Sequence, residues 1–336
     1  MNDIPFGFGA HPSKEDPRTI SHTDITLGAP VPPAALIDYS DIPHKNQMKV
    51  GICTAACVTA LAEKQFGTAW RGSMEWLYKI GKVFIDGNMD EGSSIFTMLK
   101  AAQKYGIPSE SKYPSDCNRS YAEFMSDTNI TQEMLDDASL HKIGGYVSVP
   151  LTADALMQAI YTSKCGLATR MSVGSSWWTD EEGNATWDKD KLQPLRAPQS
   201  VVSGHAIGQV GYQANQDLLL IDRNSWSEQW CDNGDVSFYF KTQAPYFTEA
   251  WTITDKVLFT KDLRMGQSGP DVMRLQQFLN THGFPVALSG IGSSGNETFY
   301  FGLATFNALK KAQQANNIPA TGYFGPITRA WANKLL

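Results

Sequence analysis

The hydrophobic pattern changes its period once, near residue 142. Between about residues 50 and 140 apolar side chains recur at helical spacing, and beyond that point they alternate or run together as in strands. A block of helices followed by a block of strands predicts an α+β fold with a cleft between a helical half and a β half. The expected helices are 53–65, 73–82, 94–105, 131–141 and 153–163, and the expected strands are 144–150, 166–173, 205–213, 217–223 and 235–241.

Length, composition and charge exclude several classes of protein. A chain of 336 residues predicts two domains, and its 42% hydrophobic and 18% charged residues are typical of a globular protein. The net charge of −6 argues against a nucleic-acid binder. No apolar run is long enough to span a membrane, and residues 1–5 carry no basic or apolar leader, so we expect neither a membrane span nor a signal peptide.

Charge and turn residues indicate where the chain divides. Residues 1–34 are rich in Pro and Gly without helical period, which predicts an extended arm on the surface. Residues 261–336 carry seven Lys or Arg against three Asp or Glu, a net of +4, so the remainder carries −10. We therefore predict an arm at 1–34, a large domain at 35–258 and a small domain at 262–336. The small domain is expected to hold helices at 270–282, 301–316 and 326–335.

Five cysteines leave at least one thiol free. Cys53 begins a predicted helix two residues after Gly51, where the helix dipole stabilises a thiolate. Gln47 precedes it by six residues and brings a side-chain amide to the same point. Cys57 lies one turn further, on the buried face, and is a poor candidate for a nucleophile.

His205 is the histidine whose sequence context suggests chemistry. It opens an apolar strand, and Asn224 ends the next strand, so pairing of the two strands brings the amide oxygen beside the ring. Taken alone, a buried cysteine or a histidine before a strand is more often structural. Their order and spacing together favour a nucleophilic thiol with a base and an orienting amide.

The motifs Gln47-x5-Cys53, Gly204-His205-Ala206 and Asn224-Ser225-Trp226 resemble those of the papain-type cysteine peptidases over residues 35–257. The resemblance implies that Cys53 is the nucleophile, His205 the base and Asn224 its orienting residue. Gln47 and the Cys53 N–H would form the oxyanion hole. It also implies four substrate-binding residues, among which Trp226 would shield the His–Asn bond from water: Gly92, Ser93, Gly204 and Trp226.

The sequence departs from this family at several positions. Ile52 and Thr54 flank the nucleophile where the family usually has Ser and Trp, and Ser93 replaces a glycine. Because the cysteines that pair in secreted relatives have no counterparts, we expect free thiols. The pair Trp177-Trp178 is consistent either with a pocket lining or with exposed loop aromatics.

The tail has a resemblance of its own. The repeated Gly and Thr turns, such as Phe301-Gly302-x2-Thr305 and Gly322-x2-Gly325-x2-Thr328, resemble the three-helix peptidoglycan-binding domain of bacterial wall hydrolases. Ala312-Gln313 stands where the family usually has Phe-Gln. The resemblance implies peptidoglycan as a partner of residues 262–336, although such modules also act as spacers.

We therefore predict a cysteine endopeptidase that hydrolyses peptide bonds through a Cys53 thioester, without metal or organic cofactor. The expected substrate is a peptide or protein, and we expect a monomer. One alternative is a peptidoglycan stem-peptide hydrolase of the autolysin or phage endolysin type. Another is a non-catalytic wall-binding protein on the same fold. The tail predicts the cell envelope or exterior as its location, or the cytoplasm if the protein is a phage lysin.

Overall fold

The computed structural model describes residues 7–16, 19–25, 32–34, 36–39, 41–127, 129–174, 177, 201–214, 217–255 and 259–336. The chain divides into two compact units, which are described separately. The first contains Met1–Glu15, Ser21–Thr23 and Gly28–Lys256, and the second contains Asp16–Ile20, Asp24–Leu27 and Val257–Leu336. No helix in these described ranges is both long and apolar enough to cross a bilayer.

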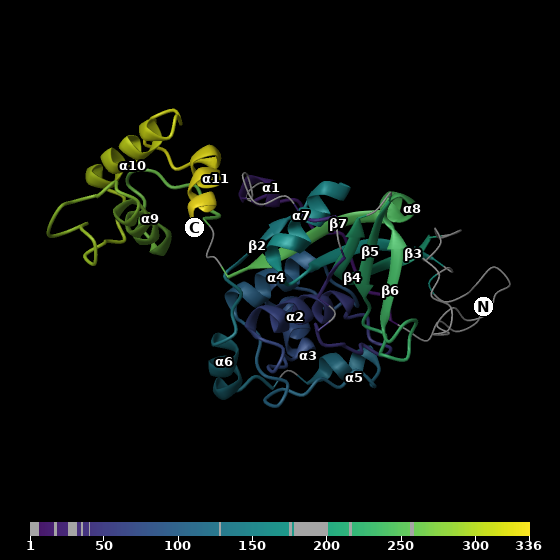
Figure 1. Cartoon of the computed structure of the whole chain (residues 1–336). Coiled ribbons are helices and arrows are strands. Elements are labelled where there is room, and N and C mark those ends of the chain that lie inside the picture. Colours follow the sequence, from purple (N-terminus) through teal and green to yellow (C-terminus); the bar gives the residue numbers. More distant parts are fainter. Residues whose placement is uncertain are drawn as a thin grey trace. The chain divides into compact units, whose positions relative to one another are not determined.

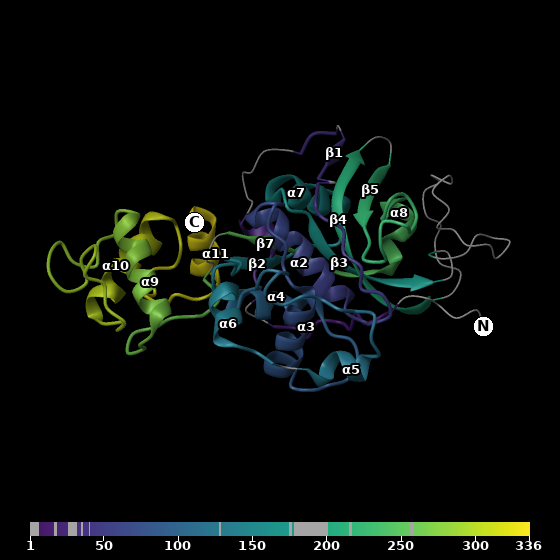
Figure 2. The ribbon, with the colours of Figure 1, turned by 90° about the horizontal axis from the view of Figure 1, so that it is seen from below.

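The helical half of the first unit is built around α2 (Cys53–Phe66), in which every residue from Cys53 to Glu63 is buried. Helix α2 packs against α3, α4 and the sheet (Figures 1 and 2). Three of the helices begin at hydroxyl caps, because the side chains of Ser73, Ser94 and Thr131 each accept a backbone N–H. The surrounding elements are α3 (Met74–Gly81), the π-helix η1 (Lys82–Asp86), α4 (Ile95–Lys104), α5 (Tyr121–Ser126) and α6 (Gln132–Ser139).

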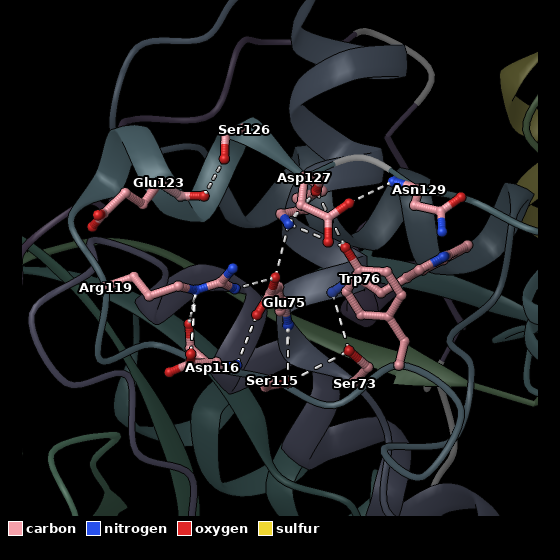
Figure 3. A network of polar contacts seen from close by, with 12 residues as sticks. Ser73, Glu75, Trp76, Ser115, Asp116, Arg119, Glu123, Ser126, Asp127 and Asn129 are labelled. Atoms are coloured by element: carbon pink, nitrogen blue, oxygen red, sulfur yellow. Dashed lines mark hydrogen bonds and ion pairs between the residues drawn. The ribbon is translucent and has the colours of Figure 1, made fainter.

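A buried ion network ties the loop after residue 114 to α3 (Figure 3). Glu75 Oε1 contacts Lys79 Nζ at 2.8 Å and Arg119 Nη2 at 2.7 Å. Its second oxygen accepts the backbone N–H of Asp116 at 2.8 Å, and its own N–H donates to Ser115 Oγ. Glu75 and Lys79 are both almost fully buried, so each buried charge is stabilised by the opposite charge of the other.

The β half is an antiparallel sheet in the order β2-β7-β3-β4-β5-β6, with β1 (Ile37–Asp38) paired to β4. Strand β7 lies between β2 and β3, although the sequence pattern gave no signal for it. Helix α7 (Ala153–Ser163) has the predicted bounds and packs against β4 and β7. The strands are β2 (Gly145–Ser148), β3 (Leu167–Gly174), β4 (Val201–Ala214), β5 (Leu218–Arg223), β6 (Asp235–Tyr239) and β7 (Phe247–Thr254); α8 (Phe240–Gln243) and η3 (Ala244–Tyr246) precede β7.

Strand β4 separates two hydrophobic cores. Ala206 belongs to the core around α2, whereas Ile207 belongs to the core that contains α7. This division follows from the alternation of side chains along a strand. His205, two residues before Ile207, faces the same side of the strand, where its ring lies against Trp177 and Trp226 of this second core.

The predicted surface arm needs a correction. Within the described part of residues 1–34, Gly9, Ala10, Ile20 and His22 are buried, and α1 (His22–Ile25) is a short helix. Glycine makes this burial possible. A Cβ on Gly9 would lie 1.9 Å from the carbonyl oxygen of Gly51, so only glycine fits this approach of two backbones.

The second unit consists of α9 (Pro270–Thr281), α10 (Leu303–Ala315) and α11 (Pro326–Leu335). Each helix begins at or next to a glycine, as the repeated turn pattern predicts. Its core is aromatic, with Phe259, Phe301 and Phe324 almost fully buried beside Leu275 and Leu309.

Candidate active site

Cys53 is the first residue of α2, and its side chain is fully buried. Gly51 precedes it and donates its backbone N–H to Glu91 Oε1 at 2.7 Å, which fixes the turn into the helix. Burial raises the pKa of the Cys53 thiol to about 11. Hydrogen bonds with the backbone of Ala206 and Gly9 oppose this rise in pKa.

His205 lies on β4, and Asn224 directly follows the end of the paired strand β5, with His205 Nε2 2.8 Å from Asn224 Oδ1. The backbone N–H of Ser225 also donates to this Oδ1 at 2.8 Å, so the atom must be the amide oxygen. His205 Nε2 therefore carries the ring proton and donates it, which leaves Nδ1 as the basic nitrogen of the neutral ring. Burial lowers the pKa of His205 to about 4, against an opposing contribution from the Asn224 hydrogen bond.

Aromatic rings enclose the His205 side chain. The ring centroids of Trp226, Trp177 and Phe8 lie 4.7, 6.0 and 6.1 Å from that of His205. Trp177 is fully buried in the second core and stacks on Trp230, so the interpretation as an exposed loop aromatic is wrong for this residue. Trp178 lies outside the described residues.

Gln47 is fully buried, and its amide is fixed on both sides. Its Oε1 accepts a hydrogen bond from Ser225 Oγ, and its Nε2 donates to the carbonyl oxygens of Val50 and Gly7 at 2.9 Å each. The orientation of the amide thus depends on Ser225. The sequence motif included this serine, but nothing in the pattern assigned it a role.

Gly92 and Ser93 lie on a loop that is held in place by hydrogen bonds with buried side chains. Lys82 Nζ donates to the Gly92 carbonyl at 2.9 Å, and the Gly92 N–H donates to Tyr78 Oη at 2.8 Å. Gly92 has φ +92°, a left-handed conformation that favours glycine. Ser93 Oγ donates to Asp86 at 2.8 Å, so the residue in place of the second glycine is turned toward η1. Sequence reasoning missed Lys82 and Asp86, since charged helix residues are usually solvated.

A segment of the N-terminal region, residues 7–13, runs through this constellation and contacts each part of it. Ser93 donates its N–H to the Gly9 carbonyl at 2.7 Å and accepts the N–H of His11 at 2.8 Å. Ala10 donates to the Gly204 carbonyl at 3.3 Å. All four residues for which substrate binding was predicted are therefore near this N-terminal segment: Gly92, Ser93, Gly204 and Trp226, the last through an edge-to-face contact with Phe8.

A cavity of about 620 Å³ is lined in part by Trp226. Its lining includes His44, Asn46, Lys49 and Glu228, and therefore charges of both signs. It is the part of the site that the N-terminal segment does not line.

All five cysteines are free thiols. Cys57 is buried one turn beyond Cys53, and burial raises its pKa strongly. Among the described residues, no group of three or more His, Cys, Asp or Glu side chains is arranged to hold a metal ion.

The first unit is similar to solved cysteine proteases. Xylellain, a cysteine protease from Xylella fastidiosa, aligns with a TM-score of 0.60 at 21% identity, covering 74% of this chain and 96% of that one. Procathepsin L2 from the larval midgut of Tenebrio molitor aligns at 0.53 and 20%, covering 74% and 78%. The ragweed allergen Amb a 11, a cysteine protease in its proform, aligns at 0.51 and 18%, covering 70% and 69%. The first unit therefore has a papain-like fold, and the predicted α+β class is confirmed.

The second unit has an independent match. Residues 268–331 match the family model of a putative peptidoglycan binding domain. No curated protein matches the chain significantly. The chain thus combines a papain-like fold with a C-terminal peptidoglycan-binding domain, as its two sets of motifs predicted.

Proposed function

We propose that this protein is a cysteine endopeptidase in which Cys53, His205, Asn224 and Gln47 carry out acyl transfer. The observation that carries the proposal is the buried 2.8 Å hydrogen bond from His205 to Asn224. It leaves the basic nitrogen Nδ1 of the ring without a hydrogen-bond partner among the described residues. The Cys53 thiol is hydrogen-bonded to the backbone of Ala206, the residue that follows His205. A purely structural histidine does not require this arrangement.

The chemistry follows from these positions. His205 Nδ1 takes the proton of Cys53, and the thiolate attacks the carbonyl carbon of the substrate. Gln47 Nε2 and the Cys53 N–H donate to the oxyanion. His205 then passes its proton to the leaving amine, so that the C–N bond breaks and a thioester remains. Water, deprotonated by His205, hydrolyses the thioester and regenerates the thiol.

The conformation described is a closed form of this site. The Gly7 carbonyl accepts a hydrogen bond from the Gln47 side-chain amide, and the Ser93 backbone is hydrogen-bonded to Gly9 and His11. Burial also favours the neutral thiol and the neutral imidazole over the ion pair. We infer that a substrate gains access only when the N-terminal segment moves aside.

A second candidate substrate is the stem peptide of peptidoglycan, and the C-terminal domain match favours it. Attachment of residues 262–336 to the wall would hold the peptidase at short peptides that extend from the same polymer. The third possibility, a wall-binding protein without catalysis, makes the opposite prediction about peptide hydrolysis.

The test is hydrolysis of a peptide library and of purified sacculi by the full chain and by Gly9→Val, which should expel the N-terminal segment. We expect new amines from the library, and their loss in Cys53→Ala and His205→Ala. Cys231→Ala, a partly exposed cysteine away from the helix terminus, is the matched control and should keep full activity. Release of amines from sacculi alone would select the stem-peptide hydrolase. Release from neither substrate would support the non-catalytic protein.

A further inference from the structure

The C-terminal domain contains one structural unit twice. The sequences Tyr300-Phe301-Gly302-x2-Thr305 and Tyr323-Phe324-Gly325-x2-Thr328 open α10 and α11, and each is held by a buried glutamine. Gln276 Nε2 donates to the Tyr300 carbonyl at 3.0 Å and to Thr305 Oγ1 at 2.8 Å. Gln313 Nε2 makes the equivalent bonds to the Tyr323 carbonyl at 2.8 Å and to Thr328 Oγ1 at 3.0 Å.

This repeat places one aromatic ring inside and one outside at each turn. Phe301 and Phe324 are fully buried in the core, whereas Tyr300 and Tyr323 are 55% and 42% exposed. Because neighbouring side chains of an extended segment point to opposite sides, burial of each phenylalanine directs the preceding tyrosine to solvent. The Tyr323 hydroxyl donates to Asp262, which fixes its ring at the surface.

The two turns are neighbours because the segment 263–268 pairs with both. Leu263 exchanges backbone hydrogen bonds with Phe324 at 3.0 and 2.9 Å, and Gly266 donates to the Phe301 carbonyl at 2.9 Å. Leu263 and Gly266 are three residues apart, a span of at most about 11 Å. Tyr300 and Tyr323 therefore belong to one surface.

Further apolar side chains and positive charge accompany these rings. Met265 lies on the pairing segment and is 53% exposed, while Leu303 and Ile327, in the first turns of α10 and α11, are 64% and 66% exposed. We call this set, Met265, Tyr300, Leu303, Tyr323 and Ile327, the tyrosine face. Arg264 is exposed on the same segment, and residues 261–336 carry a net charge of +4.

We propose that the tyrosine face binds the glycan strand of peptidoglycan, with the rings of Tyr300 and Tyr323 against the C–H faces of nearby sugars. This inference rests on the proposed wall attachment and names the surface that performs it. A tyrosine ring offers an apolar face together with a polar hydroxyl, which suits a sugar that is apolar on its faces and polar at its edge. The excess of positive charge suits the carboxylates that the stem peptides add to the strand.

The experiment measures binding of the full chain, as Cys53→Ala to prevent cleavage, to purified sacculi. The double variant Tyr300→Ala/Tyr323→Ala should weaken binding at least tenfold. Tyr300→Phe/Tyr323→Phe keeps both rings and should bind within about threefold of the parent. The matched control is Leu288→Ala/Ile291→Ala, which removes two side chains that are 93% and 84% exposed but lie outside the tyrosine face. Circular dichroism checks that each variant is folded.

A second arm identifies the ligand. Soluble oligosaccharides of N-acetylglucosamine should compete with sacculi for the parent chain, and free stem peptides should not. Competition by stem peptides alone, or equal losses in the control and alanine variants, would overturn the inference while wall attachment stands. A parent chain that does not bind sacculi would overturn wall attachment and this inference together, whereas the peptidase assay is unaffected by either result.

Discussion

The carbonyl oxygen of Gly7 accepts a 2.9 Å hydrogen bond from Nε2 of Gln47. The same nitrogen is the side-chain donor proposed for the oxyanion of a reacting peptide. The N-terminal segment therefore lies where a substrate carbonyl would bind, and Gly9 and His11 form hydrogen bonds with the backbone of Ser93. This relationship makes the described conformation closed, and several measurable consequences follow from it.

Gly9→Val should increase the rate of peptide hydrolysis by at least tenfold over the unmodified chain. A Cβ at position 9 would lie 1.9 Å from the Gly51 carbonyl, and this backbone cannot retreat, so the N-terminal segment must leave. Initial rates on a fluorogenic peptide measure the effect. Lys14→Val, an exposed position just beyond the segment, is the control and should not change the rate. Equal or lower activity in Gly9→Val would show that the segment does not limit access.

Alkylation of Cys53 by iodoacetamide should depend on pH differently in the unmodified chain and in Gly9→Val. In the closed form burial raises the thiol pKa to about 11, so the thiolate fraction at pH 7 is on the order of 10⁻⁴. The reaction of the unmodified chain should therefore accelerate continuously from pH 7 toward pH 11. In Gly9→Val, water reaches the thiol and the imidazolium can pair with it, so the rate should level off at least two pH units lower. Digestion and mass spectrometry assign the rate to Cys53 rather than Cys231.

Ser225→Ala should lower kcat by about tenfold and leave KM nearly unchanged. The hydroxyl holds the oxygen of the Gln47 amide, and without it the amide can turn away from the oxyanion. Gln47→Ala removes the donor itself, so the expected loss in kcat is about 10²–10³-fold. Both values are measured in the Gly9→Val background. A change confined to KM would assign these residues to substrate binding instead.

Glu75→Ala should destabilise the first unit by about 3–5 kcal/mol, because it leaves the buried Lys79 ammonium without its carboxylate. The contact with Arg119 is lost as well. Thermal unfolding should show a Tm lowered by several degrees. Glu133→Ala is the control, since its pair with Lys112 is exposed to solvent and contributes little to stability. Similar Tm values for the two variants would mean that the network in Figure 3 adds little to stability.

Local signals in the sequence predicted much of the fold. Ser73, Ser94 and Thr131 begin helices because their hydroxyls satisfy free N–H groups, a property visible in a short window. Strand β7 was missed because its place between β2 and β3 is decided by pairing with residues about 80 to 110 positions away. The candidate active site likewise combines one feature that the sequence predicts with one that it does not. The pairing of His205 with Asn224 follows from adjacent strands, whereas the path of residues 7–13 depends on glycine contacts that no periodicity reveals.

The central claim is that Cys53 is a nucleophile activated by His205. A peptidyl epoxide that alkylates thiol nucleophiles, incubated with Gly9→Val and followed by peptide mass spectrometry, tests it directly. The account predicts one adduct, on the sulfur of Cys53, formed at neutral pH and absent when His205→Ala is added to the same chain. No adduct on Cys53, or an equal adduct without His205, would contradict it.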